Sequence, residues 1–247
     1  MTTFRPCVLI PTYDNPRTIR DVVLAVRSVV PAVVVVDDAS AEPNRLEVER
    51  LGQEGLALVT HRSVNGGKGA AMKTGFRFAL EHGFTHAIQV DADGQHALAD
   101  VAKFLAISAE RPEALVLGQP IFDHTAPRHR MLLRQLTIFW TRREVGSDAV
   151  GDPLCGFRVY PLRQAIETHT IGDRMDFDPE IAVRLAWMGV PIVHVPTRVR
   201  YFTRAEGGVT HWRAIEDNWL ISKMHTRLMF RRVMHSLFRR PLALPPG

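Results

Sequence analysis

The amino-acid sequence predicts an α/β protein with a largely parallel β-sheet covered by helices. Two observations carry this prediction: short apolar, β-branched runs alternate with longer amphipathic stretches, and three of these runs are followed by polar or acidic residues. The alternation is typical of βαβ units, whose ligands bind beyond the carboxyl ends of the strands. A length of 247 residues and a hydrophobic content of 46% suit one domain with one sizeable core.

The first half of the chain holds the clearest elements. Strands are expected at 7–10, 33–36, 56–60, 87–90 and 115–117, and helices at 16–29, 43–53, 69–81 and 98–109. From residue 128 the alternation weakens. There we expect a helix at 131–144, a loop at 151–157, a helix at 178–188, a strand at 192–195 and a long basic helix.

The cysteines and the apolar runs bear on the compartment. Only two cysteines occur, Cys7 and Cys155, so no disulfide framework is implied and a reducing compartment is favoured. The segment from Met1 to Arg5 is too short and polar for a signal peptide. No apolar run approaches the roughly 20 residues needed to span a bilayer. We therefore expect a cytoplasmic protein whose membrane contact, if any, is peripheral and at the inner face.

Positive charge is concentrated near the C-terminal end. The net charge is +5, and the segment from Lys223 to Arg240 has six Lys/Arg and no acidic residue. Ile221, Met224 and Leu228 recur there at helical spacing. Such a helix can lie on an anionic membrane surface, or its apolar stripe can pack on the protein below a solvated basic face. Nucleic-acid binding is suggested only by this tail, and we expect none.

The turn after the fourth expected strand reads Asp91-Ala92-Asp93-Gly94-Gln95-His96. Two carboxylates that flank one alanine can approach the same cation, and hard oxygen ligands suit Mg²⁺ or Mn²⁺ shared with substrate phosphates. Gln95 and His96 are further candidate ligands at this turn. The alternative is a strand-to-helix turn in which Asp93 only caps the next helix.

Two other segments carry candidate binding residues. Tyr13, after the first strand, can stack on a nucleobase or fill the packing at the strand end. Asp38, after the second strand, can accept hydrogen bonds from a ribose or a base N–H, or it can stabilise the turn. Asn65-Gly66-Gly67-Lys68-Gly69 opens a helix, where backbone N–H groups and Lys68 can face an anion. Its spacing is not that of a P-loop.

Five ordered motifs together resemble family 2 glycosyltransferases, and most closely their dolichol-phosphate-mannose synthase-like branch. The motifs are Ile10-Pro11-Thr12-Tyr13, Val36-Asp37-Asp38-Ala39-Ser40, Asn65-Gly66-Gly67-Lys68-Gly69-Ala70-Ala71, Val90-Asp91-Ala92-Asp93-Gly94-Gln95-His96 and Cys155-Gly156-Phe157-Arg158. The resemblance implies the GT-A fold, with a mostly parallel Rossmann-like sheet flanked by helices. We expect one domain over 1–247, with a nucleotide-binding half at about 1–125, an acceptor-side half at about 126–210 and a basic amphipathic helix at 211–240.

The resemblance assigns roles to residues of this chain. The nucleotide is assigned to the first two strand ends, at Pro11, Tyr13 and Asp38. The metal and the diphosphate are assigned to the D-x-D turn, at Asp91, Ala92, Asp93 and Gln95. The segment 204–212 resembles a late loop over the diphosphate, where Arg204 or His211 can contact phosphate. Lys68 falls in the glycine-rich segment near the nucleotide.

The implied reaction moves a sugar from a UDP- or GDP-linked donor, with inversion, to a lipid-linked or cell-envelope glycan acceptor. A bound Mg²⁺ or Mn²⁺ would stabilise the charge that develops on the leaving diphosphate. Asp152 is expected to be the base, because 152–158 looks like the acceptor-side loop of the family; a turn-initiating Asp-Pro is the alternative. Glu180 is the second choice. A lipid phosphate acceptor, which is already ionised, would need no base.

One motif departs from the family. Many relatives carry Gly-Ser-Arg after the fifth strand, whereas this chain has Gly118-Gln119-Pro120, so a substrate-contacting arginine is missing there. Arg128 or Arg130 is offered in its place.

Two other function classes are weighed against this interpretation. A sugar-1-phosphate nucleotidyltransferase would carry an N-terminal glycine-rich, arginine-bearing loop, which the sequence lacks. A non-catalytic nucleotide-binding homologue would have lost the D-x-D pair or the acceptor loop, and both look intact.

Overall fold

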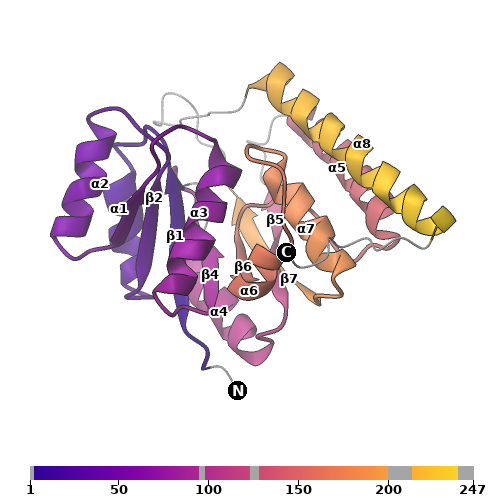
Figure 1. Cartoon of the computed structure of the whole chain (residues 1–247). Coiled ribbons are helices and arrows are strands. Elements are labelled where there is room, and N and C mark those ends of the chain that lie inside the picture. Colours follow the sequence, from indigo (N-terminus) through magenta and orange to yellow (C-terminus); the bar gives the residue numbers. More distant parts are fainter. Residues whose placement is uncertain (1–2, 95–97, 123–127, 200–212, 239–247) are drawn as a thin grey trace.

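A seven-stranded sheet forms the centre of the computed structural model, which describes residues 3–94, 98–122, 128–199 and 213–238 (Figure 1). The strands are β1 (Pro6–Thr12), β2 (Val33–Asp37), β3 (Leu58–His61), β4 (His86–Gln89), β5 (Leu115–Phe122), β6 (Arg158–Pro161) and β7 (Ile192–Val199). Their order is β3-β2-β1-β4-β6-β5-β7. Only β6 runs antiparallel to its neighbours, β4 and β5, so the described sheet is mostly parallel as expected.

The central strands are covered on both faces. All five residues of β2, including the run of four valines from Val33 to Val36, are buried, and so are all four residues of β4. A continuous apolar run of this kind suits a parallel strand with helices above and below it. Burial on both faces therefore explains why the strands in the first half of the chain could be predicted from their apolar runs.

Helices join the strands and cover the sheet. They are α1 (Ile19–Arg27), α2 (Asn44–Gln53), α3 (Lys68–Glu81), α4 (Val101–Glu110) after a short 3₁₀ turn (Leu98–Asp100), α5 (Arg128–Val145), α6 (Leu162–Glu167), α7 (Phe177–Trp187) and α8 (Ala214–Phe238). In Figure 1, α3 lies in front of the sheet, and it packs beside α6 and α7. A Cβ on Gly75 of α3 would lie 2.4 Å from Leu9 Cδ1 of β1, so this glycine permits the close approach of helix and sheet.

Strand β6 and helix α6 were not predicted, and β5 is longer than expected. β6 has only four residues, and they include the fully buried Arg158 and a terminal proline, so no apolar alternation marks it. Gly118, Gln119 and Pro120 lie inside β5, paired with Val195, Pro196 and Thr197 of β7. The departure from the family motif therefore falls within a strand, not after it.

Helix α8 packs beside α5 at one end of the molecule (Figure 1). His225 Nδ1 lies 2.6 Å from Glu144 Oε1 of α5, and Met224 and Leu228 are fully buried against Val183 of α7. The stripe that the sequence offered to a membrane is thus packed on the protein, as in the alternative interpretation. None of the described helices is long and apolar enough to cross a membrane.

Candidate functional site

A pocket of about 890 Å³ opens at the carboxyl ends of β1, β2 and β4. This is the point where the strand order reverses, between β1 and β4, and where ligands bind in open α/β sheets. Seven of the residues that the sequence assigned to binding line it together: Pro11, Tyr13, Asp38, Lys68, Asp91, Ala92 and Asp93. Gln95, His96, Arg204 and His211 lie outside the described residues, as do the side chains of Arg128 and Arg130.

Lys68 is the centre of an ion-pair cluster on the pocket wall. Its Nζ lies 2.9 Å from Asp91 Oδ1 and 3.1 Å from Asp178 Oδ2. Burial by itself lowers the pKa of Lys68, but the charges of Asp178 and Asp91 outweigh it, so the pKa is raised above its usual range. The ammonium group therefore stays charged.

Gly156 lies against this cluster. A Cβ there would be 2.8 Å from Lys68 Nζ and 3.0 Å from Asp91 Oδ2. A side chain there would force the Lys68 ammonium or the Asp91 carboxylate to shift. Glycine at this position of the fifth motif therefore leaves the ion pair in place.

The D-x-D turn fits a cation that arrives with phosphates. Asp91 and Asp93 place two carboxylates on the pocket wall, and no group of three or more His, Cys, Asp or Glu that could hold a metal exists among the described residues. Mg²⁺ is often held by one or two carboxylates together with substrate phosphates, without a complete protein cage. Lys68 already balances part of the Asp91 charge, so diphosphate oxygens would have to supply most of the remaining ligands.

Asp38 joins β2 to the glycine-rich segment before α3. Its carboxylate accepts hydrogen bonds from the backbone N–H of Gly66 at 3.1 Å and Gly67 at 2.6 Å, and from Arg62 Nε at 2.7 Å. It is almost fully buried, although it lines the pocket. Asp38 thus fixes the position of the glycine-rich segment beside the nucleotide site predicted from the sequence.

Asp152 lies beside the pocket, and its neighbour Arg134 lines it. The Asp152 carboxylate is paired with the guanidinium of Arg134, and its Oδ1 accepts a hydrogen bond from the backbone N–H of Leu154 at 3.1 Å. Asp152 is not among the residues that line the pocket, whereas Arg134 is. This geometry matches the alternative interpretation, in which Asp152 initiates a turn before Pro153. The ion pair also holds Arg134 in place. The catalytic role of Asp152 stays a prediction.

Asp178 is a pocket residue that the sequence interpretation missed. It is the second residue of α7, in the first turn of the helix, and its carboxylate faces Lys68. Buried Arg158 donates hydrogen bonds to the carbonyls of Pro153 and Asp178, both at 2.8 Å, so it ties the loop 152–158 to the start of α7. The only signal in the sequence was the acidic residue in Phe177-Asp178-Pro179, which reads equally as a helix start.

Three arginines among the described residues add positive charge to the pocket: Arg134, Arg174 and Arg213. They come from α5, from the segment before α7 and from the residue before α8. Arginine suits phosphate because its planar fork donates two parallel hydrogen bonds. The pocket therefore combines two carboxylates for a cation with several donors for phosphate oxygens.

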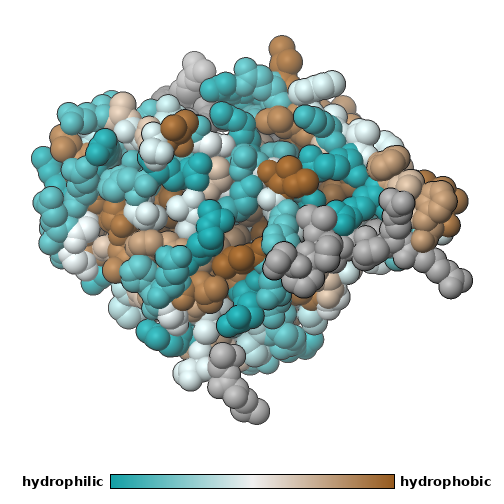
Figure 2. Space-filling view, in the orientation of Figure 1, coloured by the Kyte–Doolittle hydropathy of each residue, from teal (hydrophilic) through white to brown (hydrophobic). Residues whose placement is uncertain are grey.

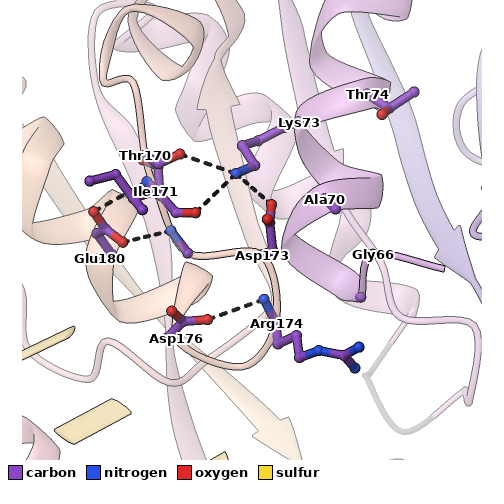
Figure 3. Close-up of polar contacts among 12 residues, drawn as sticks. Gly66, Ala70, Lys73, Thr74, Thr170, Ile171, Asp173, Arg174, Asp176 and Glu180 are labelled. Carbon is purple, nitrogen blue, oxygen red and sulfur yellow. Dashed lines mark hydrogen bonds and ion pairs between the residues drawn. The ribbon is translucent and has the colours of Figure 1, made fainter. Parts of the chain in front are cut away.

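The segment that carries Arg174 is held between α3 and α7 (Figure 3). Lys73 Nζ lies 2.7 Å from Asp173 Oδ1 and 3.1 Å from the carbonyl oxygen of Thr170. Asp176 Oδ1 accepts the backbone N–H of Arg174 at 3.1 Å. These contacts, which Figure 3 shows as dashed lines, keep the backbone of Arg174 in place at the pocket wall.

Glu180 belongs to this support and not to the pocket. It is fully buried, and its carboxylate accepts hydrogen bonds from the backbone N–H groups of Ile171 at 3.2 Å and Gly172 at 2.8 Å (Figure 3). It also pairs with Arg184 at 2.7 Å and with Arg227 of α8 at 2.6 Å. A carboxylate with these partners and no place on the pocket wall is a structural anchor, so Glu180 is a poor choice of base.

We expect Glu180→Gln to lower the free energy of unfolding by about 3 to 5 kcal/mol, because it leaves the buried Arg184 without its counter-charge. Turnover per folded molecule should hardly change. Urea denaturation and initial rates at a temperature where the variant is folded measure the two effects. Glu110→Gln, at an exposed position near the end of α4, is the matched control. Normal stability with lost turnover would return Glu180 to a catalytic role.

Comparisons with known proteins agree with this geometry. Residues 7–166 match the family model described as glycosyl transferase family 2. The chain is 29% identical over 202 residues to an undecaprenyl-phosphate mannosyltransferase of Micrococcus luteus, covering 78% of this chain and 82% of that protein. It is 28% identical over 220 residues to a polyprenol monophosphomannose synthase of Mycolicibacterium smegmatis, covering 84% and 81%.

Solved structures show the same fold at lower identity. Glucosyl-3-phosphoglycerate synthase from Mycobacterium tuberculosis, in complex with Mn²⁺, UDP and glucosyl-3-phosphoglycerate, is similar with a TM-score of 0.60 and 17% identity, covering 94% of this chain and 79% of that one. S. aureus TarS in complex with UDP-GlcNAc is similar with a TM-score of 0.56 and 14% identity, covering 96% and 76%. These likenesses confirm the expected GT-A fold.

Proposed function

The chain belongs to glycosyl transferase family 2, and from this premise we propose that it transfers mannose from a nucleoside-diphosphate sugar to a polyprenyl phosphate. The observation that supports this proposal is the composition of one pocket, which is lined by the D-x-D carboxylates, by Lys68 and by three arginines. Both reactants of such a transfer carry phosphate. Two relatives are named an undecaprenyl-phosphate mannosyltransferase and a polyprenol monophosphomannose synthase, and these names support the choice of mannose as the sugar and of a polyprenyl phosphate as the acceptor.

The donor is proposed to bind along the ends of β1, β2 and β4. Tyr13, about one-third exposed, offers a ring on which a base can stack, while Asp38 and the glycine-rich segment border the ribose. The diphosphate would lie between Lys68 and the D-x-D turn. Gln95 and Arg204 remain proposed contacts of the same diphosphate.

When bound at Asp91 and Asp93, Mg²⁺ or Mn²⁺ would neutralise the charge that builds up on the leaving nucleoside diphosphate. Mn²⁺ was present with a uridine nucleotide in the structure of glucosyl-3-phosphoglycerate synthase, which shares the fold. Lys68 supplies a further fixed positive charge at the same place, held by Asp91 and Asp178. Its raised pKa keeps that charge available throughout the neutral pH range.

The acceptor phosphate is proposed to bind at Arg134. An ionised phosphate oxygen attacks the anomeric carbon on the face opposite the diphosphate, a new C–O bond forms, and the electron pair of the old C–O bond leaves with the nucleoside diphosphate. The configuration at the anomeric carbon is thereby inverted. Because the phosphate is already ionised, this reaction requires no general base, and Asp152 acts by orienting Arg134. For a hydroxyl acceptor, Asp152 and the pocket-lining Asp178 would be the bases to test.

A polyprenyl phosphate keeps its hydrocarbon chain in a bilayer, so the enzyme is proposed to work at a membrane surface by peripheral association. Within this proposal the enzyme is cytoplasmic and works at the inner face of the membrane, as the sequence led us to expect.

The assay offers radiolabelled UDP- and GDP-linked sugars, GDP-mannose among them, and measures the label that can be extracted into an organic solvent with the lipid. We expect mannose to be transferred, and only when polyprenyl phosphate and a divalent cation are both present, because the arginine-lined pocket recognises the acceptor phosphate. Polyprenol of the same chain length, without the phosphate, is the control. Efficient transfer to polyprenol or to a water-soluble glycan would overturn the proposed acceptor.

A further inference from the structure

Helix α8 has a second apolar face besides the one packed on α7. Ile215, Trp219, Phe230 and Leu237 are 87%, 69%, 67% and 68% exposed, while Met224 is fully buried. Spacings of 4, 11 and 7 residues place the four exposed side chains on one side of a helix with 3.6 residues per turn. Large apolar side chains gathered on one exposed face mark an interaction surface.

Helix α5 adds to this surface. Leu132, Leu136 and Phe139 are exposed, at 73%, 54% and 46%, whereas Thr141 and Glu144 on the other side of the helix are buried toward the protein. The two helices lie side by side (Figure 1), and in Figure 2 hydrophobic residues are visible along the outer edge of the α8 end of the molecule. We call the exposed side chains of Leu132, Leu136, Phe139, Trp219, Phe230 and Leu237 the α5/α8 outer surface.

Basic residues border the α5/α8 outer surface. The part of α8 from Lys223 onward holds no acidic residue and four basic ones, Lys223, Arg231, Arg232 and Arg227, of which Arg227 is paired with Glu180. Helix α5 ends with Arg143 and with Arg142, which is paired with Asp148. An apolar face with basic margins is suited to an anionic bilayer, where each nearby Lys or Arg adds to the attraction. A second copy of the chain is a poorer partner, because the contact would bring two basic surfaces together.

The outer surface is continuous with the pocket through the same two helices. Arg134 and Thr137 of α5 and Asn218 and Ile221 of α8 line the pocket, while other sides of these helices are exposed. If α5 and α8 rest on a bilayer, a lipid phosphate can reach Arg134 while its hydrocarbon chain stays among the lipids.

From these observations we infer that the α5/α8 outer surface docks the enzyme on an anionic lipid bilayer and sets the pocket at the level of the acceptor phosphate. The inference rests on the proposed function for the identity of the acceptor. The docking itself depends only on the surface described here.

Flotation of the full chain with vesicles tests the docking directly. Wild type should float with phosphatidylcholine vesicles that contain about one-third phosphatidylglycerol, bind pure phosphatidylcholine more weakly, and be released as salt screens the attraction. Phe230→Glu in α8 and Phe139→Glu in α5 should each weaken partitioning by about tenfold or more, since each removes an inserted aromatic side chain. Leu24→Glu, at an exposed position of α1, is the matched control and should float like wild type.

Two further measurements separate the possible failures. Transfer to a short-chain, micelle-free polyprenyl phosphate should be unchanged in Phe230→Glu, whereas transfer to vesicle-embedded acceptor should fall with its binding. Wild type that fails to float at low salt overturns the inference, as does a wild-type dimer in light scattering that Phe230→Glu converts to a monomer. Wild type that floats but transfers no sugar to any polyprenyl phosphate leaves the docking in place and overturns the proposed function.

Discussion

Asp93→Ala is expected to abolish Mn²⁺-dependent binding of the nucleotide-sugar while the protein stays folded. Asp93 lies at the turn after β4, half-buried on the pocket wall and outside the hydrophobic core. A cation that neutralises a diphosphate is worth several kcal/mol, so donor affinity measured in Mn²⁺ should fall by about 10³-fold. Isothermal titration with the donor identified in the panel, in Mn²⁺ and in EDTA, measures the loss.

The control for this variant is Asp21→Ala, which removes an exposed carboxylate from the first turn of α1. It should bind the donor like wild type and respond to EDTA in the same way. Asp93→Ala should have the same weak affinity with and without EDTA. If Asp93→Ala binds the donor as tightly as wild type in Mn²⁺, the assignment of the cation to this turn is wrong.

The part of the candidate site at the ends of β1, β2 and β4 was predictable because its signals are local. The valine run in β2 marks a buried strand, and the carboxylates that follow β2 and β4 stand directly after such strands in the sequence. Parallel strands bring their carboxyl ends to one edge of the sheet, so the topology alone places Asp38, Asp91 and Asp93 in one pocket. The chain need only fold as a βαβ series for this prediction to hold.

The part of the candidate site around Asp152 and Asp178 was less predictable because its contacts are distant in the sequence. Asp152 pairs with Arg134, 18 residues away, and nothing in the spacing of charges on α5 singles out that arginine. Asp178 and Glu180 are two positions apart on α7 and point to different sides, since residues at i and i+2 do not share a helix face. One lines the pocket and the other is buried among arginines, which only the packing of α7 and α8 decides.

The tail of the chain shows the same limit. Met224 and Leu228 have the helical spacing of a membrane-facing stripe, yet they are buried against α7. The exposed apolar residues, such as Trp219 and Phe230, are too far apart in the sequence to form a recognisable helical repeat. A helix with two apolar faces cannot be oriented from its own sequence, because either face satisfies the periodicity.

Asp152→Asn is expected to raise the KM for polyprenyl phosphate by about 10- to 100-fold while donor affinity stays the same. The amide can still accept the hydrogen bond from the backbone of Leu154, but it loses the charge that pairs with Arg134. Both side chains of this pair are mostly buried, so Arg134 has little solvent to replace its partner. A misplaced guanidinium loses charge-assisted hydrogen bonds to the acceptor phosphate, which are worth about 1.5 to 3 kcal/mol.

The double variant decides whether Asp152 orients Arg134 or takes a proton itself. Arg134→Gln should raise the same KM, and Asp152→Asn combined with Arg134→Gln should be no worse than the stronger single variant, because both changes remove one interaction. Asp148→Asn, in an exposed ion pair with Arg142 just before the loop, is the control and should behave as wild type.

A general base would give a different pattern. Turnover of Asp152→Asn would fall by about 10²- to 10⁴-fold at unchanged KM, and the loss would add to that of Arg134→Gln. That pattern would restore Asp152 as the catalytic base and point to an acceptor that must be deprotonated.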